Sequence, residues 1–417
     1  MIPISEIQKN YGNSMAVLIQ CCRIHFKTAE IGDLNSFIKE NNIEWSDVFK
    51  TCRKHHISTL IYKILLKANL NNPTVQQKIS NLSNIFTLQS FEQAKETERL
   101  IYLFKENNIT LIPYKGTAFS KQFFGNISMR QSSDIDFIID SDAIPMAIKI
   151  MENEGFIPYQ KEYYKWIGHN NFIKKHKDFS FDKYVGNDRL FHIELHFNII
   201  NKTTHLATLK NNFDLSEKTE LKLFLKEIDC LNPVSHFKAV ALHHMLMDHM
   251  GYLKTVIDIT QMLIQISDLV ASNKINIDEK DIINQLNKNY KLDLIHDLMY
   301  TLFGVSVKNN KLQLIKNPLT KRILNSSYRK VRENKNPLFD TLNFNYNQLK
   351  NTVIFYKKRK DKIAYILKSI ISISHPQPED YMTVQLNKNI YFLYYFIRPF
   401  RLLFFPGDPN KKCLNLK

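Results

Sequence analysis

Hydrophobic residues recur three and four positions apart over two long parts of the chain, which predicts helices there. This pattern runs from Ala16 to about Glu98, and it returns after Asn201. Within the second part, residues 233–270 are expected to form two helices separated at Gly251. Residues 390–406 are also apolar but are interrupted by Arg398, Pro399 and Arg401. For these we expect a buried helix and turn, with contact to a membrane surface as the alternative.

Between the two helical parts the pattern changes to an alternation of polar and apolar positions. Strands are expected at residues 108–116 and 134–140, and helices at 117–125 and 141–155, with Ser141 or Asp142 as the N-cap of the latter. Residues 163–200 are expected to form paired strands around a turn at 184–188. The prediction is an α+β fold in which a small mixed β-sheet core, residues 101–200, is flanked by helical regions at 1–100 and 201–417.

The composition fits this picture and narrows the class of protein. With 417 residues, 44% of them hydrophobic and only 10 glycines, the chain is a folded and mostly helical protein rather than a disordered or glycine-rich β protein. The five cysteines form no CxxC pair and no zinc spacing, which indicates reduced thiols. No signal peptide and no uncharged apolar run of about 18 residues is present. We therefore expect a cytoplasmic protein without a membrane span.

A formal net charge of +17 favours an anionic ligand such as a nucleotide, RNA or an acidic lipid. The densest basic stretches, residues 321–335 and 355–362, are expected to be solvated helix faces, with an RNA-contacting surface as the alternative. Charge alone does not decide between these ligands.

Asp134 and Asp136 are separated by one residue in the segment SSDIDFIID. On a strand such residues point to the same face, while Ile135 points into the core. Two carboxylates on one face repel each other unless a cation lies between them, and Mg²⁺ or Mn²⁺ bridging to phosphates suits this arrangement. An exposed polar strand face is the plain alternative.

A phosphate-binding turn is expected just upstream, at Gly116 in YKGT. A glycine lets the backbone approach a phosphate, and the helix that follows presents unpaired N–H groups to it. Lys115 and Arg130 would supply positive charge, and Thr117 and Ser133 would supply hydroxyl groups. These five residues, together with His196 further along the chain, are the predicted nucleotide-binding set.

Downstream, the segment HIELHF places His192, Glu194 and His196 on one strand face. If this strand lies beside Asp134 and Asp136, Glu194 becomes the third carboxylate at the metal. It would hold the metal and help deprotonate a hydroxyl, and His196 would orient it or contact substrate. Zinc binding is the less favoured alternative, because no convincing third ligand follows at a suitable spacing.

The order of a glycine turn, a DxD strand and a later acidic strand resembles the polymerase-beta-type nucleotidyltransferase superfamily. More narrowly, residues 114–140 resemble an uncharacterised bacterial nucleotidyltransferase family with a KG…R…DxD signature, here Lys115, Gly116, Arg130, Asp134 and Asp136. Segments at 52–66, 241–263 and 390–404 are also similar to that family, the second ending near Asp258. Thr117 departs from the superfamily's usual Gly-Ser or Gly-Gly turn, and Glu194 from its commoner Asp, which puts substrate geometry in doubt more than activity.

The resemblance implies an enzyme that moves a nucleoside monophosphate from an NTP, with ATP as the expected one, to a hydroxyl of an unidentified acceptor. A small molecule, peptide, protein or RNA could be that acceptor. Two other functions remain open on the same fold: a kinase that transfers the γ-phosphoryl group, and a catalytically inactive protein that binds nucleotide or RNA.

Overall fold

The computed structural model describes residues 1–201, 218–273, 289–306, 318–325, 346–347, 349–372 and 375–404. The chain forms two compact units, Met1–Ile138 with Phe213–Lys330, and Ile139–Asn212 with Val331–Lys417. Among the helices of the described ranges, none combines the length and the apolar character that a membrane span requires.

The first unit begins with five helices, which confirms the helical pattern predicted for this part. They are α1 (Ile4–His25), α2 (Ile31–Glu40), α3 (Trp45–Lys54), α4 (Ser58–Leu65) and α5 (Pro73–Glu106). The long helix α5 starts at a proline, and the Asn72 side chain caps it by accepting the N–H of Val75 at 3.1 Å. Cys21, Cys22 and Cys52 are buried free thiols in this bundle. Cys413 lies outside the described residues.

Five strands form the small mixed sheet that the sequence predicted, in the order β1-β2-β5-β4-β3. Their bounds are β1 (Ile112–Pro113), β2 (Ile135–Ile138), β3 (Ile157–Pro158), β4 (Asp178–Val185) and β5 (Asp188–His196). β1 pairs antiparallel with β2, and β4 pairs antiparallel with both β3 and β5. Ile139, directly after β2, donates its N–H to the carbonyl of His196 at the end of β5, at 3.0 Å.

Short helices lie between these strands, and two of our expectations about them were wrong. α6 (Gly116–Phe124) follows β1, and η1 (Ser141–Ala143) and α7 (Ile144–Asn153) follow β2. Asp140 is the N-cap of η1, and its carboxylate accepts the N–H of Asp142 at 3.0 Å. The N-cap of α7 is Ala143, without a side-chain hydrogen bond, rather than Ser141 or Asp142. Residues expected to be strand instead form α8 (Lys161–Ile167) and α9 (His169–Lys175).

The helical period of α8 was hidden by its aromatic content. Tyr163 and Ile167, four residues apart, are the buried positions of that helix, so the apolar residues follow the helical spacing. Gly168, with φ +82°, then separates α8 from α9. Aromatic residues favour strands in general, and here tertiary packing overrides that preference.

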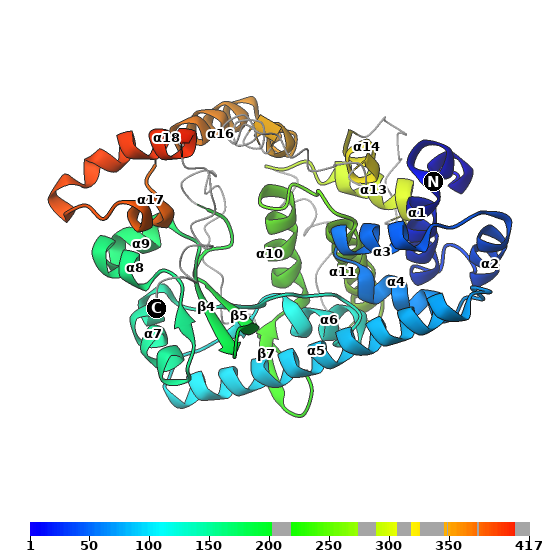
Figure 1. The fold of residues 1–417 in the computed structure, drawn as a ribbon, viewed down its shortest axis with the longest axis horizontal. Helices are drawn as coiled ribbons and strands as arrows, with labels where there is room; N and C mark the ends of the chain where they lie inside the picture. The colour runs from blue at the N-terminus through cyan, green and yellow to red at the C-terminus, as the bar shows by residue number, and fades with distance from the viewer. Residues whose placement is uncertain are drawn as a thin grey trace. The chain divides into compact units, whose positions relative to one another are not determined.

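The rest of the first unit contains a hairpin that the sequence did not predict and a helix pair that it did. β6 (Lys218–Lys222) pairs antiparallel with β7 (Glu227–Leu231). The helices that follow are α10 (Pro233–Leu246), α11 (Leu253–Ala271), α13 (Asp293–Phe303) and α14 (Pro318–Asn325). α10 and α11 pack against one another on either side of Gly251, as expected (Figure 1).

The second unit ends in α16 (Arg359–Ser372), α17 (Pro378–Thr383), η3 (Lys388–Leu393) and α18 (Tyr394–Phe404). The buried helix expected here was wrong: Phe392, Phe396 and Phe400 are exposed. The cause is the buried carboxylate of Asp380, which binds Arg398 and Arg401 and so turns the basic face of α18 toward α17. Most of the basic stretch predicted at 321–335 lies outside the described residues.

Candidate functional site

The glycine turn lies directly against the aspartate segment, within the first unit. Gly116 is the first residue of α6 and has φ +68°, a backbone conformation that residues other than glycine rarely adopt. A Cβ placed on Gly116 would lie 3.5 Å from the backbone oxygen of Asp134. Lys115 is the N-cap of α6, so the helix begins its run of backbone N–H groups directly after the turn.

The two aspartates differ in their local structure. Asp136 is buried within β2, and its backbone oxygen accepts the N–H of Tyr114 at 2.9 Å. Asp134 lies in a bend one residue before β2 instead of within the strand as expected. Its carboxylate accepts the hydroxyl of Ser133 at 2.9 Å, so Ser133 contacts the candidate metal ligand itself.

The hairpin of the second unit presents a continuous polar face. The register pairs Asp178 with His196, Ser180 with Glu194 and Asp182 with His192, and paired residues share a face. Phe179, Phe181, Ile193 and Leu195 lie on the opposite face and are fully buried. The alternation predicted for residues 192–197 is confirmed over 192–196.

Three basic groups surround the Glu194 carboxylate on this face. His196 Nε2 lies 3.1 Å away, His192 Nε2 3.5 Å and Lys177 Nζ 3.7 Å. Burial by itself would raise the pKa of Glu194, but the histidines and Lys177 outweigh it and hold the pKa well below its usual range. Glu194 therefore carries a negative charge at neutral pH.

A cavity of about 760 Å³ opens on the same face, next to His192. His192 Nδ1 lies 2.6 Å from Asp182 Oδ1. Although burial opposes it, the pKa of Asp182 is lowered by His192 and Arg189. The lining of the cavity combines these three side chains with Tyr159 and Tyr184, among others.

One group of possible metal ligands occurs among the described residues. Asp136, Glu194 and His196 each offer one atom, and these atoms lie within 4.8 Å of one another. Two carboxylates and an imidazole fit Mn²⁺, and Mg²⁺ fits the carboxylate oxygens with waters completing its shell. The donor set is thus compatible with the predicted metal, although the group contains His196 and not Asp134, which the sequence predicted as a ligand.

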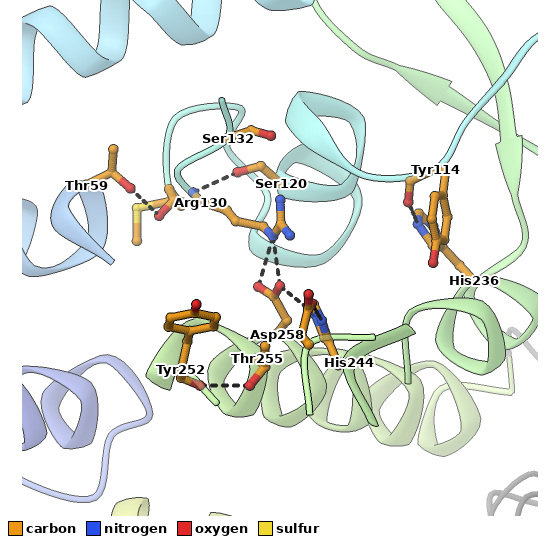
Figure 2. A network of polar contacts seen from close by, with 12 residues as sticks. Thr59, Tyr114, Ser120, Arg130, Ser132, His236, His244, Tyr252, Thr255 and Asp258 are labelled. Atoms are coloured by element: carbon orange, nitrogen blue, oxygen red, sulfur yellow. Dashed lines mark hydrogen bonds and ion pairs between the residues drawn. The ribbon is translucent and has the colours of Figure 1, made fainter. Parts of the chain in front are cut away.

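Behind α6, a chain of buried polar groups holds Arg130 (Figure 2). Arg130 donates through Nε to both carboxylate oxygens of Asp258, each at 2.9 Å. Asp258 also bonds His244 Nε2 at 3.0 Å, and His244 Nδ1 lies 2.7 Å from Asp248 Oδ2. Arg130 donates its backbone N–H to Ser120 Oγ at 3.1 Å, which fixes this residue to α6.

The same cluster contains Lys254, one helical turn before Asp258 on α11. Burial, followed by repulsion from Arg130 and Lys115, lowers the pKa of Lys254 to about 8, while Asp258 and Asp248 oppose the shift. In Asp258 the attraction of Arg130, His244 and Lys254 outweighs burial and lowers the pKa. The cluster therefore holds ionised carboxylates against several cations.

The sequence analysis gave no role to Lys254, His244, Asp248 or Asp182. The signal for the first three was available: His244 and Asp248, like Lys254 and Asp258, are spaced by four residues in a helical pattern, which places each pair on one face. Thr117, predicted to bind phosphate, is buried, and its hydroxyl has no hydrogen-bond partner within the described part of the chain.

A family profile described as an uncharacterised nucleotidyltransferase matches residues 41–289, more than half of the chain. The match includes the glycine turn, both aspartates, the β4–β5 hairpin and the Arg130 cluster. Comparison with curated proteins and with solved structures gives no match.

Proposed function

This chain belongs to the uncharacterised nucleotidyltransferase family, and from that premise we propose that it transfers a nucleoside monophosphate from an NTP, ATP in this proposal, to the hydroxyl of a small molecule. One observation carries the proposal: Asp136, Glu194 and His196 offer ligand atoms within 4.8 Å of one another, in a chain of this family. A grouping of acidic and imidazole ligands suits a divalent cation that bridges to phosphate oxygens.

In this proposal Asp134, Asp136 and Glu194 hold two Mg²⁺ or Mn²⁺ ions. When bound, such ions lower the charge on the phosphates and activate the attacking hydroxyl. Ser133 fixes one oxygen of Asp134 by donating its hydroxyl at 2.9 Å. His196 orients Glu194 through the 3.1 Å contact of its Nε2.

The electrostatics support a particular role for Glu194. A general base works best with a pKa near the operating pH, whereas a metal ligand needs to be ionised. The pKa of Glu194 is held well below its usual range by His192, His196 and Lys177 against the effect of burial. We therefore assign Glu194 mainly to holding the metal, with help in deprotonation as the lesser part.

The phosphates of the NTP are proposed to bind at the start of α6. Gly116 has the positive φ that lets the backbone approach a ligand, and the α6 N-terminus offers N–H groups to an anion. Lys115 and Arg130 supply positive charge, and the Thr117 hydroxyl, which has no hydrogen-bond partner among the described residues, is proposed to bind a phosphate oxygen.

The acceptor is proposed to enter the cavity beside His192. About 760 Å³ is the size of a small-molecule site rather than of a surface for RNA or protein. In its lining, Arg189 Nη1 lies 3.5 Å from Asp182 Oδ1, so these opposite charges balance each other. The cavity is therefore less basic than the chain as a whole. Tyr159 and Tyr184 add rings and hydroxyl groups. We propose an uncharged, hydroxylated acceptor.

The proposal is tested by replacing Asp134 and Asp136 with Asn, singly and together. Mg²⁺-dependent release of pyrophosphate from ATP, in the presence of a small-molecule extract, should fall below detection in the double variant. Asp142→Asn, whose side chain is 93% exposed in the second unit, is the matched control and should keep wild-type activity. Circular dichroism checks that the variants are folded. Undiminished pyrophosphate release by the double variant would exclude this site.

A further inference from the structure

The cluster behind α6 has more positive than negative charge. Two carboxylates, Asp248 and Asp258, face three basic side chains, Lys115, Arg130 and Lys254, whose charges act on them or on one another. Both carboxylates are already engaged by His244, and Asp258 also by Arg130. This excess of positive charge favours an anionic ligand.

Arg130 brings an unpaired donor to this cluster. Its side chain is only 3% exposed, and Nη1 is buried without a hydrogen-bond partner among the residues that the structure describes. A buried guanidinium nitrogen left without a partner is costly, so such a group in a native protein calls for a ligand or a water. The Phe119 ring, whose centroid is 4.7 Å from the guanidinium carbon, covers one side of it.

The neighbouring backbone is suited to the same ligand. Phe119 and Ser120 both belong to α6, the nine-residue helix that begins at Gly116. Ser120 Oγ accepts the backbone N–H of Arg130, so the arginine is tied to the helix whose N-terminus attracts anions. The observation that goes beyond a helix terminus is the buried Nη1 of Arg130, which has no hydrogen-bond partner among the described residues.

We propose that Lys254 and Nη1 of Arg130 bind the terminal phosphates of the nucleotide, and that Asp248, His244 and Asp258 act as a chain that positions Arg130 for this contact. The inference rests on the proposed function and adds to it a phosphate ligand, Lys254, together with three positioning residues. Because Asp258 binds Nε, the other end of the guanidinium stays directed away from the carboxylate.

The state of Lys254 gives the site a pH dependence. The groups that act on it are Arg130 and Lys115, which oppose its charge, and Asp258 and Asp248, which favour it. The nearby His56 is itself depressed in pKa, first by burial and then by Lys254, so it stays neutral at pH 7 and above. With a pKa of about 8, the ammonium of Lys254 is lost as pH rises through that value, and phosphate affinity should fall with it.

Calorimetric titration of the full-length protein with inorganic tripolyphosphate, without divalent metal, tests the inference. Lys254→Ala should weaken binding about tenfold or more, since a charge-assisted contact is lost. Lys254→Arg should retain most of the affinity and abolish its decline near pH 8, because a guanidinium stays protonated there. Lys50→Ala, a 67% exposed lysine of the same unit, is the control and should bind as wild type.

The positioning role is tested separately at Asp248, the most exposed of the three positioning residues. Asp248 is 32% exposed, so Asp248→Asn should fold, and thermal melting checks that it does. It should weaken tripolyphosphate binding and move the midpoint of the Lys254-dependent pH decline to lower pH, because Asp248 favours the charged form of Lys254. If Asp248→Asn binds tripolyphosphate with unchanged affinity, Asp248, His244 and Asp258 do not position Arg130.

The outcome separates this inference from the proposed transferase function. If Lys254→Ala binds tripolyphosphate as tightly as wild type, or if wild type does not bind it, the inference is overturned whatever the enzyme does. If ATP turnover proves independent of Asp134 and Asp136 while tripolyphosphate binding still depends on Lys254, the transferase proposal fails and the phosphate site stands.

Discussion

The buried pair of Arg130 and Asp258 should contribute strongly to the stability of the first unit. Asp258→Asn keeps the side-chain volume but removes the charge. The two side chains are 3% and 1% exposed, so solvent does not screen them, and Asp258 accepts Nε–H at 2.9 Å as well as His244. Removing one member of a buried ion pair costs about 3–5 kcal/mol, because the other charge is left without compensation. We expect a loss at the lower end, about 3 kcal/mol, because Asn still accepts one hydrogen bond.

The loss should depend on pH in a defined direction. Asp258 has a lowered pKa in the folded protein, so its stabilising effect is complete above the unfolded-state pKa of about 4 and disappears as pH falls through the folded value. The part of the difference between wild type and Asp258→Asn that comes from the Asp258 charge should therefore be complete at neutral pH and shrink below about pH 4.

Urea unfolding followed by tryptophan fluorescence measures this loss in the unit concerned. The chain has two tryptophans, Trp45 in the first unit and Trp166 in the second, so a Trp166→Phe background makes the signal report the first unit. Asp268→Asn, at an exposed position of the same helix α11, is the control and should change stability by less than about 0.5 kcal/mol. A loss below about 1 kcal/mol for Asp258→Asn would refute the reasoning, since that is the value of an exposed pair.

Three further predictions concern the candidate site. Gly116→Ala should lower the unfolding free energy by about 1–2 kcal/mol, because φ +68° is unfavourable for alanine. It should also raise KM for ATP, and an unchanged KM would show that the turn does not bind the nucleotide. Glu194→Gln should weaken Mn²⁺ binding about tenfold or more in an electron paramagnetic resonance titration, and full retention of affinity would exclude Glu194 as a ligand. Tyr184 lines the cavity, and Tyr184→Ala should raise KM for the acceptor but not for ATP. A raised KM for ATP with an unchanged KM for the acceptor would show that the acceptor does not bind in this cavity.

Local spacing in the sequence was sufficient to predict the parts of the site that lie on single elements. The alternation in 192–196 placed His192, Glu194 and His196 on one face, and the hairpin register confirms it. The turn at Gly116 was also predicted from short-range pattern, and Gly116 has a positive φ at the start of α6. The division into 1–100, 101–200 and 201–417 stays a prediction.

The rest depends on contacts between distant residues. Arg130 and Asp258 are 128 positions apart, and no periodicity relates them. The buried Asp380 that turns the basic face of α18 inward is likewise invisible in the apolar pattern of residues 390–404, which led us to expect the phenylalanines inside. Long-range ion pairs of this kind override local propensity, and so they must be seen in the structure.

The position of the label transferred from ATP tests the central claim most directly. Full-length protein is incubated with Mg²⁺, a small-molecule extract and ATP labelled at either the α- or the γ-phosphate, and the products are separated by chromatography. Nucleotidyl transfer predicts label in a new product from α-labelled ATP, labelled pyrophosphate from γ-labelled ATP, and neither with the Asp134→Asn, Asp136→Asn double variant. A new product labelled only from γ-labelled ATP would show a kinase and contradict the account.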